Sequence, residues 1–275
     1  MTTTHTRAPS AETKAPRRSA LLQRDWSLLA QRLGALGIIL ALWQAAVLTG
    51  LLPSITPTVP EVTLGLWTAV TSTSFWTALG QTLSAATAGW IISCVLGVFL
   101  GLLIGPLRWL DRSTSVTVEF GRAFPTIALM PVILLLLGAT TSMQITMVVL
   151  SALWPVLVQS ILGARRLDPG IADTVRIYRI PRLLWFRRVL LPSALPFVTT
   201  GVRIAASISI LAAVGIEVLT QVPGIGRMIT LAQEAQRWDL AFAYLFFAGL
   251  FGWTVTALLA RAESSLLAWN RQASG

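Results

Sequence analysis

Long apolar segments without charge recur along the chain. Four stretches carry no charged residue at all: residues 33–60, 62–107, 123–164 and 240–260. A helix needs about 20 apolar residues to cross the hydrocarbon core of a bilayer. The pattern therefore predicts six membrane-spanning helices, at residues 32–52, 82–105, 122–138, 143–163, 193–220 and 240–261.

Two interruptions shape this pattern. The uncharged stretch 123–164 is too long for one span, and Gly138, Ala139, Thr140 and Thr141 indicate a hairpin between two helices. Residues 53–81 contain several Pro, Thr and Ser. They predict an extended segment and a short helix over residues 62–73, lying outside the bilayer or along its surface.

The basic residues predict the orientation. Most of the 21 Lys and Arg residues fall in four blocks, at residues 7–32, 108–122, 165–188 and 261–271. Basic residues in short loops stay on the cytoplasmic side. An even number of spans with both termini in the cytoplasm follows, so the fold class expected is an all-α, polytopic membrane protein.

Composition agrees with a membrane protein. The chain is 55% hydrophobic and 12% charged, well below the charged fraction of soluble domains, and its mean hydropathy is +0.73. The net charge of +10 does not indicate nucleic-acid binding, because the basic residues lie in blocks between apolar spans. Residues 1–31 read as a basic, disordered cytoplasmic tail ahead of a membrane domain at residues 32–275.

The sequence contains few residues of the types that catalysis or metal binding requires. His5 is the only histidine and Cys94 the only cysteine, so no metal site and no catalytic residue is predicted. A phosphate-binding loop needs a lysine after glycine, but the only lysine, Lys14, follows Thr13. This chain therefore carries no such ATP site, and energy would come from a partner or a gradient.

The loop at residues 165–191 is the most informative segment. It has room for two short helices, one over residues 171–179 and one opened by Pro181. Its apolar residues, Ile171, Val175, Ile177, Leu184, Trp185 and Phe186, would form a buried face, with arginines on the other. A plainer interpretation stays open, in which the arginines only set the topology.

Residues 173–196 resemble the cytoplasmic coupling loop of binding-protein-dependent ABC importer permeases. That signature reads Glu-Ala-Ala, three residues, Gly, nine residues, Ile, any residue, Leu-Pro. Leu191 and Pro192 match its end, Val189 takes the Ile position and Arg179 the Gly position. Asp173, Thr174 and Val175 replace Glu-Ala-Ala, so the head of the motif departs from the family pattern.

Other segments resemble the nitrate, sulfonate and taurine branch of these permeases. They are residues 81–90, 124–131, 195–203 and 217–226, and the resemblance spans residues 35–270. It implies a type I ABC importer transmembrane domain of the bacterial inner membrane that imports a small organic or inorganic anion. The implied partners are two ATP-binding cassette subunits carrying ATP and Mg, a second permease copy, identical or related, and an extracytoplasmic substrate-binding protein.

The resemblance also assigns candidate residues. Those expected to couple to the ATPase are Asp173, Thr174, Val175, Arg176, Arg179, Trp185, Phe186, Val189, Leu191 and Pro192. Weaker candidates for the translocation path are Glu217, Arg203, Met130 and Trp154. An acid inside a span is a functional candidate by default, but a structural pair at Glu217 is an equal alternative. Arg203 could extend to the cytoplasmic membrane interface or pair across a dimer, and a structural role is the favoured interpretation.

Two other classes compete with a permease. A secondary transporter or channel not coupled to ATP should show several intramembrane charges, broken helices or an internal repeat. The sequence offers mainly Glu217 and Arg203. A membrane enzyme should show a cluster of polar catalytic groups near one interface, which the sequence lacks.

Overall fold

In the computed structural model, all the described secondary structure is helical, which confirms the all-α expectation. The structure describes residues 18–166, 170, 175 and 177–266. The chain divides into two compact units, Met1–Val59 and Pro60–Gly275. Among the described residues, five helices are long and apolar enough to span a membrane, or six if one bent pair counts as a span.

The first unit contains the helix α1, Arg18–Leu48. It ends at Leu48, and Gly50, with a φ of 75°, closes the turn that follows, where the Leu51 amide donates to the Ala46 carbonyl at 3.0 Å. The expectation of a disordered tail up to residue 31 is not met from Arg18 onward. Leu, Gln, Arg and Ala dominate this part of the chain and are good helix formers.

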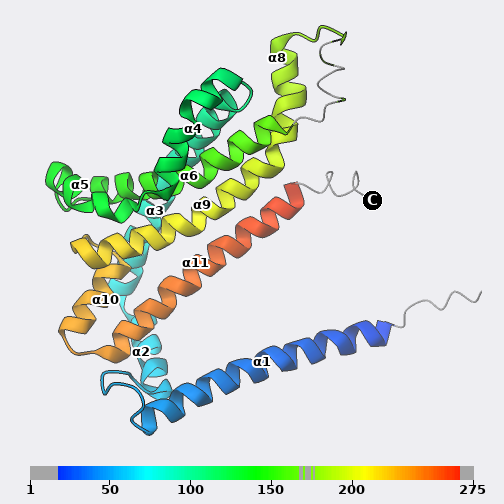
Figure 1. Ribbon diagram of the computed structural model, residues 1–275. Coiled ribbons are helices and arrows are strands. Elements are labelled where there is room, and N and C mark those ends of the chain that lie inside the picture. The colour runs from blue at the N-terminus through cyan, green and yellow to red at the C-terminus, as the bar shows by residue number, and fades with distance from the viewer. Residues whose placement is uncertain (1–17, 167–169, 171–174, 176, 267–275) are drawn as a thin grey trace, which may run out of the picture. The chain divides into compact units, whose positions relative to one another are not determined.

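From Val59 onward the chain forms a series of helices of very different length (Figure 1). They are α2 (Val59–Thr71), α3 (Thr73–Ile104), α4 (Arg108–Ala123), η1 (Thr126–Leu129), α5 (Met130–Leu137), α6 (Thr141–Arg165), α8 (Arg182–Trp185), η2 (Phe186–Leu190), α9 (Leu191–Thr220), α10 (Ile225–Glu234) and α11 (Trp238–Leu266). The predicted hairpin at residues 138–141 is confirmed, because Gly138 ends α5 and Thr140 caps α6.

Small residues bring α3 and α6 together in parallel. A Cβ added to Gly101 would lie 2.3 Å from the Cβ of Ser160, and one added to Gly105 would lie 2.5 Å from that of Ala164. Gly97 meets Val156 at the same register, one turn earlier on both helices. Glycines spaced by four residues let two backbones approach closely, as in other membrane helix pairs.

The helices α9 and α11 complete the bundle in alternating directions. Gly163 near the end of α6 lies against Ala194 at the start of α9, whereas Gly201, farther along α9, lies against Pro155. α9 therefore runs antiparallel to α6. α11 runs antiparallel to α9 in turn, since Arg203 of α9 pairs with Glu263 and Ser207 pairs with Thr256.

The third predicted span is not one straight helix. Residues 108–123 form α4, and the following helical segment, residues 126–137, is bent from it by 86°. Phe124 precedes Pro125 and is extended, as the proline ring requires, so the helix cannot continue through it. Because α3 and α6 are parallel, the chain returns to the starting side of the bundle through this bent pair.

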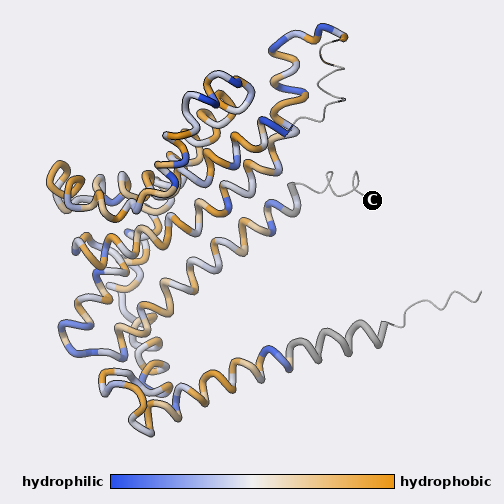
Figure 2. The backbone as a smooth tube through the Cα atoms, in the orientation of Figure 1, coloured by the Kyte–Doolittle hydropathy of each residue, from blue (hydrophilic) through white to orange (hydrophobic). Residues whose placement is uncertain are grey.

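The structure also corrects one predicted boundary and adds one helix. α3 begins at Thr73 rather than at residue 82, because Phe75, Ala78 and Leu79 are buried in a core with α10 and α11. α10 is not among the predicted elements. Figure 2 shows that apolar residues cover the long helices, whereas hydrophilic residues gather on α4, on α8 and around the turn between α10 and α11.

Candidate functional site

The loop that leads into α9 is only partly described. Arg166 follows α6, and its guanidinium lies over the Phe197 ring of α9, 5.6 Å from the ring centre. Asp173, Thr174 and Arg176 of the predicted coupling residues lie outside the described residues. The head of the signature and the first predicted short helix therefore remain predictions.

Arg179 occupies a backbone position that favours glycine. Its φ is 47°, in the left-handed region, and the amide of Ile180 donates to the carbonyl of Val175 at 3.2 Å. This six-residue closure is the one that ends many helices, usually with glycine at the left-handed position. The left-handed backbone at Arg179 therefore explains why the family signature has glycine at this position.

The second predicted helix of the loop is confirmed and continues directly into α9. Pro181 precedes α8 and accepts a hydrogen bond from the Trp185 amide at 2.9 Å. One widened π turn follows, in which the Leu191 amide donates to the Phe186 carbonyl. Pro192 has no amide hydrogen and its ring crowds the preceding turn, which accounts for the widening.

The described apolar residues of this loop are mostly exposed within the chain, so the predicted burial on a partner subunit stays a prediction. Ile177 is 75% exposed, Leu183 70% and Leu184 47%, while Phe186 is 37% exposed and Trp185 is half-buried. The arginines around them are exposed as well: Arg179, Arg182, Arg187 and Arg188. Val189 and Pro192 are half-buried and Leu191 is exposed, so the end of the signature sits where the loop joins the bundle.

A charged cavity lies beside this loop, between α4 and α6. It has a volume of about 280 Å³, and its lining includes Asp111, Thr114, Glu119, Arg122 and Arg165. The last residue of α6, Arg165, forms an ion pair with Asp111. None of these residues is among the predicted site residues. The polar side chains that recur over residues 108–122 are the feature of the sequence that could have indicated this cavity.

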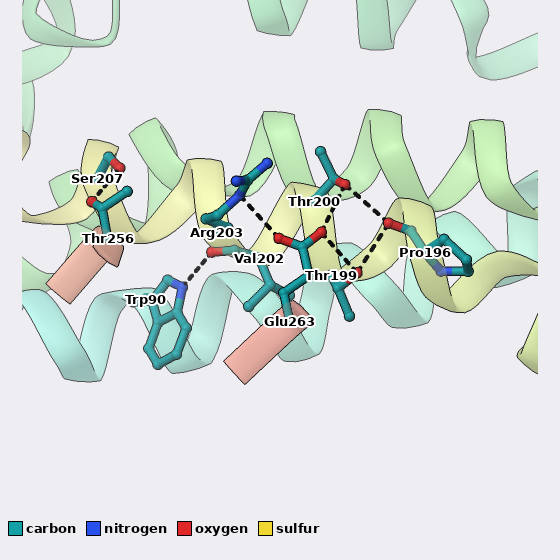
Figure 3. A network of polar contacts seen from close by, with 9 residues as sticks. All are labelled: Trp90, Pro196, Thr199, Thr200, Val202, Arg203, Ser207, Thr256 and Glu263. Atoms are coloured by element: carbon teal, nitrogen blue, oxygen red, sulfur yellow. Dashed lines mark hydrogen bonds and ion pairs between the residues drawn. The ribbon is translucent and has the colours of Figure 1, made fainter. Parts of the chain in front are cut away.

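A polar network joins α9 to α11 and α3 (Figure 3). Arg203 Nε lies 3.1 Å from Glu263 Oε2, and the hydroxyls of Thr199 and Thr200 donate to Glu263 Oε1 at 3.4 and 3.3 Å. The Trp90 indole of α3 donates to the Val202 carbonyl at 2.9 Å. Arg203 thus has an ionic partner within the same chain, as a structural role requires, and its predicted part in the translocation path stays a prediction.

Three other path candidates make packing contacts between helices. Met130 is buried beside Met143 and Met147. Trp154 of α6 lies directly against Gly121 of α4, where a Cβ would overlap its ring. Glu217 is fully buried in α9, and its carboxylate accepts hydrogen bonds from α3, α6 and α10. In the described part of the chain, no group of three His, Cys, Asp or Glu residues is placed to hold a metal.

These features define a polytopic helical membrane protein built around the parallel pair of α3 and α6. A loop with exposed apolar and basic side chains continues directly into α9. The family model for the binding-protein-dependent transport system inner membrane component matches residues 93–263. The chain belongs to this family and is a membrane permease component of ABC importers. Energy for such importers is supplied by separate ATPase subunits.

Curated relatives of the chain carry several substrates in their names. SsuC of Escherichia coli strain K12, described as a putative aliphatic sulfonates transport permease protein, is 30% identical over 84% of this chain and 89% of its own length. The nitrate import permease protein NrtB of Leptolyngbya laminosa is 27% identical over 67% of this chain and 66% of its own. The riboflavin transport system permease protein RibX of Chloroflexus aurantiacus is 27% identical over 93% of this chain and 96% of its own length.

Solved structures share the fold. A chain of the inward-facing MetNI methionine ABC transporter has a TM-score of 0.62 at 16% identity, covering 70% of this chain and 95% of that one. A chain of a bacterial ABC transporter involved in alginate import has a TM-score of 0.61 at 12% identity, covering 91% of this chain and 99% of that one.

Proposed function

We propose that this chain is the membrane-spanning permease of an ATP-driven importer for a small organic or inorganic anion, such as a sulfonate or nitrate. The names of SsuC and NrtB support an anion. RibX, which carries riboflavin in its name, is also similar, so the fold itself does not choose the solute. ATP and Mg would be bound by two partner ATP-binding cassette subunits.

One observation carries the coupling proposal. Ile177, Leu183 and Leu184 are exposed on a loop that continues as one helix into α9. Exposed apolar side chains beside arginines are typical of a protein interface. Residues 165–191 would therefore be the coupling loop, with the ATPase covering its apolar side chains and any tilt of α8 reaching α9 through the π turn.

The basic residues support an orientation. The start of α4, with Arg108 and Arg112, would face the cytoplasm together with both termini. The same holds for α8 and η2, which carry Arg182, Arg187 and Arg188. The turn before α10 would then face outward, where a substrate-binding protein delivers the solute. A second copy of this chain or a related permease would complete the passage, with residues 32–275 as the membrane domain and residues 1–31 as a cytoplasmic extension.

Reconstitution tests the proposal. The chain is purified alone and together with its proposed ATPase and binding-protein partners, and each preparation is placed in liposomes. We expect no ATP hydrolysis by the chain alone, and uptake that requires both partners and ATP. Taurine, an alkane sulfonate, nitrate and bicarbonate would be compared as solutes. Uptake without ATP that an ionophore abolishes would instead identify a secondary transporter.

A further inference from the structure

Glu217 holds together four helices through one buried carboxylate. Its side chain is 0% exposed. Oε1 accepts a hydrogen bond from Gln144 Nε2 of α6 at 2.7 Å. Oε2 accepts one from the Thr82 hydroxyl of α3 at 2.9 Å and one from the backbone amide of Gly226 in α10 at 2.8 Å.

The same contacts complete the first turn of α10. The opening amides of a helix have no partner within it. Here the Ile225 amide donates to the Thr82 hydroxyl at 2.9 Å, and the Gly226 amide donates to Glu217. α10 therefore receives its cap from α3 and α9 rather than from its own preceding residue, Gly224.

Close packing fixes the shape of this turn. A Cβ on Gly224 would lie 2.2 Å from the Glu217 carboxylate, and one on Gly226 would lie 2.4 Å from the Val214 carbonyl oxygen. Gln221 takes a left-handed conformation, with φ at 59°, to reverse the chain after α9. The turn is shaped around the carboxylate.

Beyond its first turn, α10 is held mainly by apolar packing, with one long hydrogen bond of 3.4 Å from the Thr230 hydroxyl to the Val218 carbonyl of α9. Ile225, Ile229 and Ala232 lie in a core with Phe75 and other residues of α3 and α11. The opposite side of the helix is polar and exposed, with Arg227, Gln233 and Glu234. A buried acceptor that loses its donors, or donors that lose their acceptor, costs more free energy than the bond itself contributes.

We propose that Glu217 is a positioning residue, a hydrogen-bond latch that fixes α10 and its exposed polar side against α3, α6 and α9. It acts by accepting three hydrogen bonds and not by carrying charge or protons along a path. This inference rests on the proposed function for its role: in the proposed orientation, the polar side of α10 faces the binding protein. The latch itself depends only on the contacts above.

Glutamine at this position separates hydrogen bonding from charge. In Glu217→Gln, the new carbonyl oxygen accepts from Thr82 and Gly226, and the new amide donates to Gln144 once that side chain turns its own amide over. All partners stay satisfied without a charge. Glu217→Ala removes every acceptor and leaves the Gly226 amide and the Gln144 side chain without partners.

Cysteine reactivity measures whether α10 is released. In a Cys94→Ala background, Ala232→Cys places a buried thiol under α10, and Leu190→Cys places a buried thiol at the other end of α9. The full-length purified chain is treated with a maleimide that does not cross membranes. We expect Glu217→Ala to raise the labelling rate of the thiol at position 232 about tenfold and leave that at position 190 unchanged. Glu217→Gln should keep both rates within about twofold of the parent.

The other outcomes overturn the inference. Unchanged protection of the thiol at position 232 in Glu217→Ala shows that the carboxylate does not hold α10. A Glu217→Gln variant as reactive as Glu217→Ala shows that the charge is required. If Glu217→Ala exposes the thiol at position 190 too, the chain has unfolded, and Thr82→Val decides instead. That variant removes one donor to Glu217 and the acceptor for Ile225, and it must raise the reactivity at position 232 alone.

A separate arm tests the proposed function. In spheroplasts, Gln233→Cys on the exposed side of α10 should react with the same reagent from outside. Failure to label there contradicts the proposed orientation. The measurements on purified protein, where both faces are accessible, still decide whether Glu217 is a latch.

Discussion

Arg203 on α9 and Glu263 on α11 form an ion pair, with 3.1 Å between Nε and Oε2, and two threonines of α9 donate to the same carboxylate. Both side chains are only partly exposed, at 38% for Arg203 and 17% for Glu263. α9 continues from the loop that carries α8, so this pair attaches α11 to the helix that the proposed coupling loop would move.

Reversing the two charges tests the pair. We expect Arg203→Glu and Glu263→Arg each to lower the free energy of unfolding by about 1–3 kcal/mol, because each puts like charges together at a partly buried site. The double variant should recover part of that loss. Thermal unfolding of the detergent-purified variants measures it. If the double variant is no more stable than the less stable of the two single variants, the two charges do not interact.

The parallel contact of α3 and α6 gives a second prediction. Gly101→Ala should lower stability by about 1–3 kcal/mol, because its Cβ meets Ser160 and the α6 backbone with no room to move. Gly80→Ala on the same helix is the control, since nothing lies within 4 Å of the added carbon. Gly80→Ala should be neutral or stabilising by up to about 1 kcal/mol.

Thermal unfolding and membrane yield compare the two glycine variants directly. Adding Ser160→Gly to Gly101→Ala should restore part of the stability, because it removes the nearest side-chain atom. Equal stability of Gly101→Ala and Gly80→Ala would contradict the close packing of α3 and α6.

The coupling loop supplies a third prediction. Phe186→Ala should abolish ATP hydrolysis by the assembled transporter while the protein still inserts in the membrane, since truncating a buried interface aromatic typically costs about 2 kcal/mol or more. Arg179→Gly is the matched control. Glycine accepts the left-handed backbone there and should raise stability by about 1 kcal/mol.

Co-purification of the ATPase with each loop variant is the measurement. We expect Arg179→Gly to retain the ATPase and Phe186→Ala to lose it. The proposal fails if Phe186→Ala binds the ATPase and transports normally, and defects appear only when several arginines are removed. The loop would then serve only to set the membrane topology.

Orientation gives the fourth prediction. Ser115 is exposed on α4, in a region with Arg108 and Arg112, and should face the cytoplasm. In the Cys94→Ala background, Ser115→Cys should resist an impermeant maleimide in intact spheroplasts and react after the membrane is opened. Labelling from outside would reverse the proposed topology.

The apolar runs predicted most of the bundle because membrane helices are specified by length and hydropathy alone. Short elements were harder. α10 places Ile225, Ile229 and Ala232 at helical spacing, so the signal existed, but the segment is too short and polar to register as a span. The bend after α4 also had a local signal in Phe124-Pro125, whereas its angle depends on packing against α6.

Pairing between distant residues left no trace in the sequence read alone. Glu217 could be singled out as an acid within a span, but Thr82 and Gln144 are ordinary polar residues on other helices. Glu263 likewise lies just beyond the predicted end of a span, where an acid needs no explanation. Tertiary contacts, not local preference, give these residues their roles.

Glycine contacts between α3 and α6 limit which parts of the protein are free to rearrange during transport. Sliding or rotating either helix would drive Gly97, Gly101 and Gly105 into backbone and side-chain atoms of the other, so the pair behaves as one rigid frame. Gly163 and Gly201 hold α9 against α6 through backbone contacts of the same kind, so access to the two sides of the membrane must alternate through the helices outside this three-helix frame. The helix is broken at Phe124-Pro125, where the segment with α5 turns by 86° from α4, so a change of that angle would bend no continuous helix.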